Sequence, residues 1–330
     1  MAADRVLVWG TGNVYYANCQ LLDYLKKQGV LQIVALVTKD RNAEIKDGCP
    51  VISKDEIHDY EWDIIVVAAL GEMAESIQRD IRQLGIGTDR VISIWDYAKK
   101  HAGTDTEYYR QTVARQIDVL KQILSASDEQ VGDLDWMCAR IKEYGIFPFR
   151  KQGEDALYTQ YGMMQVVEEF AGLCCYISKL NIQTAIEIGV NAGKSSYIMC
   201  ALLSRHNQGL KYTCVDIYDV MDSFDMYHAV LPSLEKQIPT TSKDYAGISY
   251  DFVFIDADHS YDASIIDWQN VGKFANRITC FHDIYAHEYD SLNGGVVRTW
   301  KEVMELTKDK KHKVFSSYPD QWMGIGVVEH

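Results

Sequence analysis

The chain has 330 residues, 47% of them apolar, and a net charge of −14, which suits two globular domains and opposes binding to a polyanionic nucleic acid. No uninterrupted apolar run reaches the roughly eighteen residues of a membrane helix, and the first residues lack the apolar region of a signal peptide, so we expect a cytoplasmic protein that inserts in no membrane. The eight cysteines form no CxxC or zinc-type spacing, and we interpret them as reduced and buried.

A buried strand and a glycine turn open the chain. Residues 5–9 are apolar after Arg5, and Gly10 and Gly12 follow. The apolar residues that then recur on one helical face are Val14, Ala17, Leu21 and Leu25. Strands at residues 33–37 and 63–68 continue a β-α-β pattern, so residues 1–103 predict a Rossmann-like domain with a parallel sheet.

The dinucleotide fingerprint of this first domain is incomplete. Tyr15 stands in place of the third glycine, and the second strand ends in Val37-Thr38-Lys39 rather than in an acid that would bind ribose. Lys39 or Asp40 would be partial substitutes. We predict a domain that keeps the fold without using NAD; it resembles the Rossmann modules associated with nucleotide sugars. An NAD-linked oxidoreductase, the alternative, requires the missing groups to be dispensable.

A polar, helix-prone linker is predicted at residues 104–145. Its apolar residues at helical spacing are Val113, Ile117, Leu120 and Leu124. This stripe requires a partner, either between domains or on a second subunit of a homo-oligomer. The second domain then spans residues 146–330. Tyr158, Gln160 and Tyr161 precede its first long helix, where they either close over a ligand or pack as surface aromatics.

Residues 184–196 form a β-branched run that breaks into a glycine turn before a helix. Gly193-Lys194-Ser195 supplies the end of a P-loop, but the glycine required five residues before Gly193 is Ile188. What remains is the spacing of Glu187, Gly189 and Gly193. This spacing resembles motif I of class I S-adenosylmethionine (SAM) methyltransferases, although an ordinary strand-to-helix turn would also explain it.

Three further strands end in polar side chains. Residues 212–216 end in Asp216, residues 251–256 end in Asp256 with His259 beyond it, and residues 278–283 end in His282-Asp283. Ligands of open α/β sheets sit beyond the carboxyl ends of the strands, so these ends predict a site. Asp216 stands about where such a sheet places the acid that accepts ribose hydroxyls. A hairpin is predicted at residues 312–318 and 323–328.

Residues 145–330 resemble the small-molecule O-methyltransferases that act on sugars and antibiotics, such as the macrolide-sugar and cephalosporin-pathway enzymes. The resemblance rests on the segment 254–261, on His282-Asp283, and on residues 294–296 before a helix around Trp300. It implies a seven-stranded, doubly wound sheet whose last strand is antiparallel. It also implies SAM as the cofactor.

Carried over residue by residue, the resemblance implies that Asp256 and Asp283 hold a magnesium ion and that His259 is the base. His282 would be a third, tentative metal ligand. Several relatives have Glu-Asp where this chain has His282-Asp283, and magnesium prefers oxygen ligands. Three alternatives therefore stay open: Mg²⁺, another divalent ion such as Mn²⁺, or no metal. Without a site, Asp256 would be a helix N-cap and His259 an ordinary residue of a helix N-terminus.

The sequence thus predicts an α/β protein with an N-terminal Rossmann-like parallel sheet and a C-terminal class I methyltransferase sheet. We expect a SAM-dependent O-methyltransferase for a hydroxyl of a small molecule, most plausibly a sugar or sugar-bearing metabolite. Glu187, Gly189 and Gly193 would surround the methionine part of SAM, and Asp216 would hold its ribose. The remaining alternative is a non-catalytic binding or scaffold protein with a vestigial SAM fold.

Overall fold

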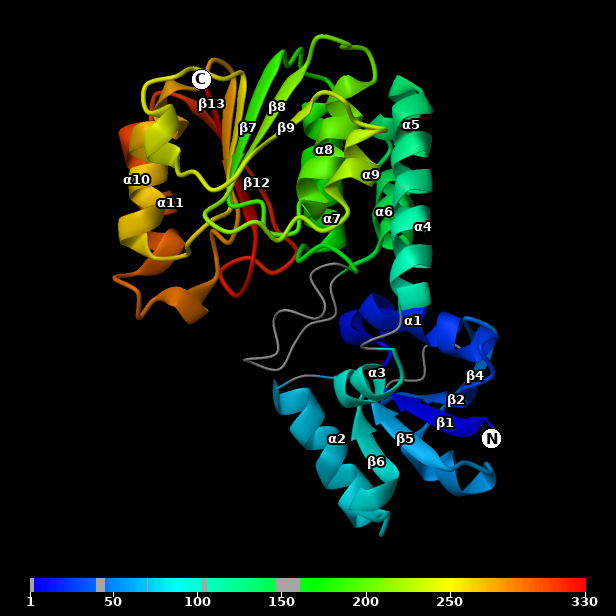
Figure 1. Cartoon of the computed structure of the whole chain (residues 1–330). Helices are drawn as coiled ribbons and strands as arrows, with labels where there is room; N and C mark the ends of the chain where they lie inside the picture. The colour runs from blue at the N-terminus through cyan, green and yellow to red at the C-terminus, as the bar shows by residue number, and fades with distance from the viewer. Residues whose placement is uncertain (1–2, 40–44, 70, 103–105, 147–160) are drawn as a thin grey trace. The chain divides into compact units, whose positions relative to one another are not determined.

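The computed structural model of the protein describes residues 3–39, 45–69, 71–102, 106–146 and 161–330 (Figure 1). The chain forms two compact units, of which the first comprises Met1–Thr112 with Gly145–Met164 and the second Val113–Tyr144 with Gln165–His330. Asp40, Tyr158 and Gln160, which the sequence analysis considered, lie outside the described residues. No helix within these ranges is long and apolar enough to cross a membrane.

The first unit contains a six-stranded sheet in the order β3-β4-β2-β1-β5-β6. Its strands are β1 (Asp4–Trp9), β2 (Leu31–Val37), β3 (Ile45–Lys46), β4 (Cys49–Ile52), β5 (Ile64–Val67) and β6 (Val91–Ser93). All neighbours pair in parallel except β3 and β4. The strands predicted at 5–9, 33–37 and 63–68 are therefore confirmed as β1, β2 and β5, and the β3–β4 hairpin is an addition.

Alternate residues of β1 bury on opposite faces of this sheet, as the two-residue period of a strand requires. Val6 and Val8 pack in one apolar cluster with residues of α1 (Asn13–Lys27) and α3 (Ile94–Ala102). Leu7 and Trp9 pack in a second cluster with residues of α2 (Gly71–Gln83). Helices therefore cover both faces of the sheet.

The glycine turn after β1 has no space for a larger residue at Gly10. Gly10 has φ +109°, and a Cβ there would lie 2.4 Å from the carbonyl oxygen of Ala68. Tyr15 is buried, and its hydroxyl donates to Asp47 Oδ2 at 3.0 Å. Lys46 Nζ donates to the carbonyl of Thr11 at 2.7 Å, so the β3–β4 hairpin reaches back to the turn.

The second unit contains a seven-stranded sheet in the order β12-β13-β11-β10-β7-β8-β9. Its strands are β7 (Thr184–Ile188), β8 (Lys211–Val215), β9 (Leu234–Gln237), β10 (Phe252–Ile255), β11 (Ile278–Phe281), β12 (Lys311–Phe315) and β13 (Ile325–Glu329). β13 pairs antiparallel with both β11 and β12, and all other neighbouring strands pair in parallel. The predicted α/β fold, with its antiparallel last strand, is confirmed.

Helices lie on both faces of the second sheet (Figure 1). They are α7 (Val167–Ile177), α8 (Lys194–Ser204), α9 (Phe224–His228), α10 (Tyr261–Asn270) and α11 (Gly295–Leu306). Ile265 and Trp268 of α10 and Trp300 of α11 pack on strand residues that include Ile186 and Val253. Figure 1 shows α7 and α8 on the opposite side of the sheet from α10 and α11.

The predicted linker is helical as α4 (Thr106–Ser125), α5 (Asp128–Gly132) and α6 (Leu134–Tyr144). The boundary between the two compact units falls within α4, and residues 113–144 belong to the second unit. The buried stripe of α4 differs from the predicted one, because Ile117 and Leu124 are only half-buried. The buried residues of α4 in this part are Val113, Gln116, Val119, Leu120 and Ile123.

Candidate active site at the carboxyl edge of the second sheet

Gly189 holds the turn after β7 directly against the end of β10. Its φ is +87°, and a Cβ there would lie 2.3 Å from both the carbonyl oxygen of Asp256 and Cα of Ala257. Its N–H donates to the carbonyl of Val215, the last residue of β8, at 2.8 Å. Only glycine allows both the backbone angle and this close approach. The turn therefore joins the ends of three neighbouring strands.

Glu187 lies beneath this turn, fully buried, and its carboxylate is satisfied within the protein. Ser195 Oγ donates to Oε1 at 2.6 Å, and the hydroxyl of Tyr212 donates to Oε2 at 2.7 Å. Burial raises the pKa of Glu187 to about 7, although these hydrogen bonds oppose the shift. Glu187 thus stabilises the glycine turn through Ser195 and Tyr212. Its direct contact with a cofactor stays a prediction.

Gly193 is the N-cap residue of α8 with φ +73°, and Lys194, the first residue of the helix, is buried. Lys194 is buried, and its Nζ donates to Gln116 Oε1 at 3.1 Å and to the hydroxyl of Tyr227 at 2.9 Å. Burial lowers the pKa of Lys194 to about 7. A lysine held in this way does not extend toward a phosphate group, which agrees with the rejection of a P-loop from the spacing.

Asp216 follows β8 and lies beside the glycine turn. Its Oδ2 accepts the N–H of Asn191 at 2.8 Å, and its Oδ1 accepts the N–H of Tyr218 at 3.1 Å. The carboxylate is partly exposed, and each oxygen keeps further capacity to accept a hydrogen bond. The sequence prediction that Asp216 belongs to the same edge as Gly189 and Gly193 therefore agrees with its position.

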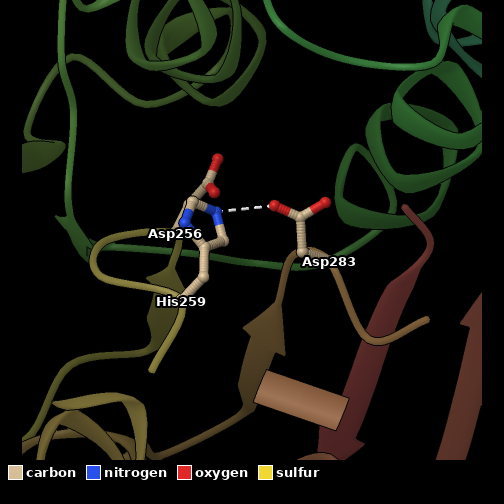
Figure 2. Close-up of side chains that lie close together, drawn as sticks. All are labelled: Asp256, His259 and Asp283. Carbon is tan, nitrogen blue, oxygen red and sulfur yellow. Dashed lines mark ion pairs between the residues drawn. The ribbon is translucent and has the colours of Figure 1, made fainter. Parts of the chain in front are cut away.

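Asp256, His259 and Asp283 converge from the ends of β10 and β11 (Figure 2). One potential ligand atom from each lies within 4.8 Å of those of the other two. His259 Nε2 lies 2.6 Å from Asp283 Oδ2, a distance typical of a charge-assisted hydrogen bond. Asp283 has a left-handed backbone with φ +59°, which aspartate tolerates better than most residues.

The charges of this cluster shift two pKa values in opposite directions. Burial alone would lower the pKa of His259, but the hydrogen bond and the charge of Asp283 outweigh it and raise the value above that of a free histidine. Burial alone would raise the pKa of Asp283, but the charge of His282 and the hydrogen bond from His259 hold it well below its usual range. His259 and Asp283 therefore behave as an imidazole–carboxylate pair.

His282 lies below this pair, with 3% of its side chain exposed. Its Nδ1 is 3.2 Å from Asp256 Oδ1 and 3.3 Å from Asp283 Oδ2. Within the described residues, neither ring nitrogen has a partner in good hydrogen-bond geometry, so these contacts are ionic. Burial opposes protonation, yet the two carboxylates raise the pKa of His282 well above its usual value. The potential ligand atoms that converge are those of Asp256, His259 and Asp283, and the role of His282 as a tentative ligand stays a prediction.

Two residues that the sequence analysis did not identify contribute to the site. Gln165 Nε2 donates to Asp256 Oδ2 at 3.2 Å. Glu169 of α7 accepts the N–H groups of Ser317 at 2.7 Å and Gly324 at 2.9 Å, and so fixes the loop between β12 and β13. No local motif marks either residue, because their partners lie 91 to 155 positions further along the chain.

The donor set of Asp256, His259 and Asp283 fits a divalent cation. Two carboxylates supply hard oxygen ligands, and an imidazole is an acceptable third ligand for Mn²⁺ more than for Mg²⁺. The hydrogen bond between His259 and Asp283 leaves Asp283 Oδ1 available. Asp256 and Asp283 can therefore both bind a cation while His259 stays hydrogen-bonded to Asp283.

Two parts of the chain match protein-family models. Residues 186–284, which carry the glycine turn, Asp216 and the Asp256–Asp283 cluster, match the family described as a methyltransferase domain. Residues 2–92 match the family described as C2185-like, N-terminal. No curated protein matches the chain.

Several solved structures are similar to part of the chain at low identity. The O-methyltransferase TomG from Streptomyces achromogenes, in complex with SAM, is 14% identical, with a TM-score of 0.40 over 50% of this chain and 80% of that one. The O-methyltransferase from Bacillus cereus, in complex with SAH, is 14% identical, with a TM-score of 0.39 over 71% of this chain and 96% of that one. The methyltransferase PaMTH1 from Podospora anserina, bound to SAH, is 10% identical, with a TM-score of 0.40 over 68% and 95%. Likeness at this level does not assign a function.

Proposed function

We propose that the second unit is a SAM-dependent O-methyltransferase that acts on a hydroxyl group of a small molecule, and that this molecule is a sugar or sugar-bearing metabolite. One observation carries this proposal: a glycine turn with a neighbouring strand-end acid and an imidazole–carboxylate pair lie at the same edge of one sheet. The match of residues 186–284 to a methyltransferase-domain family supports it.

The turn and Asp216 provide the cofactor half of the proposed site. Gly189 and Gly193 would give the turn the left-handed backbone, with φ +87° and +73°, against which the methionine part of SAM would lie. Asp216 would accept hydrogen bonds from the ribose hydroxyls while its backbone partners, the amides of Asn191 and Tyr218, hold the carboxylate in place. Glu187 supports the turn through Ser195 and Tyr212.

His259 and Asp283 provide the proton-transfer half. Methyl transfer from a sulfonium to a hydroxyl is an in-line displacement, and the hydroxyl must lose its proton as the new bond forms. Asp283 Oδ2 accepts the hydrogen on His259 Nε2, so the lone pair of the neutral imidazole resides on Nδ1. Nδ1 would take the proton of the acceptor hydroxyl, and Asp283 would stabilise the imidazolium that results.

Metal assistance forms a second part of the proposal. Asp256 and Asp283 would hold a divalent cation, which when bound would lower the pKa of the acceptor hydroxyl. His282 would act as a buried counter-charge between the two carboxylates rather than as a ligand. Chelation followed by addition of Mg²⁺ or Mn²⁺, with methyl transfer as the readout, distinguishes a metal-assisted enzyme from one that relies on His259 alone.

The cofactor assignment is tested by calorimetry with SAH and with ATP. We expect SAH to bind and ATP to give no comparable heat. Asp216→Ala should weaken SAH binding by about 1.5 to 3 kcal/mol for each charge-assisted hydrogen bond lost. Asp219→Ala is the matched control, because it removes a nearby carboxylate that pairs with Lys236. Equal SAH affinity in the two folded variants would refute the role of Asp216.

The proton acceptor is tested by transfer of labelled methyl from SAM to a panel of hydroxylated small molecules that includes sugars. His259→Ala should lower kcat by about 10²- to 10⁴-fold, the usual contribution of a positioned base, with SAH affinity unchanged. His206→Ala is the control, since this exposed histidine pairs with Asp128. If both variants turn over like the wild type, His259 is not the base. Binding of SAH without transfer to any acceptor would favour a non-catalytic protein.

A further inference from the structure

We propose that Tyr289 is a positioning residue, which fixes the plane of the His259 imidazole by stacking on it. This inference rests on the proposed function, because it assigns the stack a purpose in proton transfer. Tyr289 itself need not touch the cofactor or the reacting atoms.

The two rings are nearly parallel, with centroids 4.3 Å apart and an angle of 13° between their planes. Aromatic stacking of this kind contributes about 0.5 to 1.5 kcal/mol beyond the burial of area. The hydrogen bond from His259 Nε2 to Asp283 sets how the ring is rotated within its plane. The Tyr289 ring sets the plane itself. Together the two contacts leave the imidazole one orientation, so that Nδ1 points in a fixed direction.

The backbone around Tyr289 is held against the start of α10. Residues 282–294 connect β11 to α11, and in this segment the carbonyl of Leu292 accepts the N–H of Tyr261 at 3.2 Å. Asn293 Nδ2 donates to Asp262 Oδ1 at 3.1 Å. Three residues beyond Asn293, the N–H of Val296 donates to the carbonyl of His259 at 3.0 Å. The segment that carries Tyr289 is therefore hydrogen-bonded to the segment that carries His259, in addition to the contact between the two rings.

The glycine that begins α11 also bears on the position of Tyr289. Gly295 has φ +56°, and a Cβ there would lie 2.8 Å from the carbonyl oxygen of Tyr289. A larger residue at position 295 would overlap the backbone of Tyr289 and displace it. This requirement gives a physical reason for glycine at position 295, the first residue of α11.

The stack is tested by NMR of the His259 ring protons at constant pH, in protein labelled with ¹³C-histidine and assigned with His259→Ala. The tyrosine ring current should shift these protons upfield in the wild type and in Tyr289→Phe. Tyr289→Leu and Tyr289→Gln should return them toward the values of an unstacked histidine. Tyr285→Leu, which removes a tyrosine from the same segment, is the control and should leave the shift in place. An unchanged shift in either folded non-aromatic variant overturns the proposal.

Kinetics then separate positioning from a structural role. With any acceptor that the wild type methylates, Tyr289→Leu should lower kcat by about tenfold to 10²-fold, the range expected from a small misplacement of a reacting group, with KM and SAH affinity nearly unchanged. Tyr289→Phe should restore kcat. A wild-type kcat in a Tyr289→Leu variant that has lost the ring shift also overturns the proposal. Failure of SAH to bind refutes the proposed function instead, and the NMR comparison remains valid without it.

Discussion

Lys194 is a charged residue type in an apolar and aromatic environment. Its Nζ lies 4.5 Å from the ring centroid of Tyr227 and 5.7 Å from that of Tyr197. A neutral amine has two hydrogens, which suffice for its hydrogen bonds to Gln116 and Tyr227. The amine therefore needs no charge to satisfy its partners, and burial favours the neutral form.

This environment makes stability depend on pH through Lys194. Its pKa is about 7 in the folded protein and about 10.4 in the unfolded chain, so between these values the unfolded chain binds more protons. The free energy of unfolding attributable to Lys194 should rise with pH from about 7 to about 10, by at most about 1.4 kcal/mol per pH unit. Below pH 7 Lys194 is protonated in both the folded and the unfolded chain, so the stability gained at higher pH is absent.

Urea unfolding of the wild type and Lys194→Met at several pH values from 6 to 9 measures this effect. The stability of the wild type relative to Lys194→Met should increase with pH, and Lys194→Met should be the more stable of the two at pH 6. Lys211→Met replaces an exposed lysine and should show no such trend. A difference between wild type and Lys194→Met that stays constant with pH would show that the amine titrates normally.

At the scale of elements, the β7–α8 turn contacts the end of β10. This contact places the proposed cofactor-binding residues beside the cluster of Asp256, His259 and Asp283. Gly189→Ala should destabilise the protein, because the added methyl overlaps the backbone of Asp256 and Ala257. It should also weaken SAH binding, since either the turn or the strand end must move. The measurements are the urea midpoint and calorimetry with SAH.

Gly247→Ala separates the overlap from the backbone strain. Gly247 has φ +77°, close to the value at Gly189, but a Cβ there would meet no atom within 4 Å. This variant should lose about 1 kcal/mol or somewhat more from the strained backbone alone and keep its SAH affinity. Gly189→Ala should lose more stability than Gly247→Ala. Equal losses in the two variants would show that the turn accommodates a methyl group.

Most of the sheet elements were predictable from sequence because their apolar runs are bounded by glycine or by acids. β9 (Leu234–Gln237) was missed because only Leu234 is buried and the other residues are polar. The stripe of α4 was shifted because a buried polar residue, Gln116, occupies a core position to bind Lys194. Spacing alone does not reveal a buried amide whose partner is 78 residues away.

The candidate site was predictable only as a set of strand ends. The sequence placed Asp256, His259 and Asp283 at one edge, because parallel strands end together. Their pairing was not predictable, since it depends on side-chain directions and on the left-handed backbone of Asp283. Gln165, Glu169 and Tyr289 carry no local signal, because each acts on a residue that is distant in the sequence or beyond a loop.

At the scale of the whole chain, a second unit that we propose is a methyltransferase is combined with a first unit that we predict does not use NAD. Neither NADH nor NADPH should bind at physiological concentrations, because Tyr15 fills the place of the third glycine and pairs with Asp47. A fluorescence titration of the full-length protein measures this. Saturable micromolar binding that is lost in Gly12→Val would instead support the oxidoreductase alternative. Gly12→Val should fold, since a Cβ at Gly12 meets no atom within 4 Å.

The left-handed backbone of Asp283 limits which residues evolution or an engineer can place there. Asparagine and glycine adopt this conformation readily, whereas β-branched and bulky residues do not. Asp283→Asn therefore changes the charge while preserving the chain path, and Asp283→Gly preserves the path without any side chain. A saturation library at this position would separate two populations: a few folded but inactive proteins, and many that fail to accumulate. The set of residues tolerated at position 283 would thus show separately which substitutions abolish activity and which prevent folding.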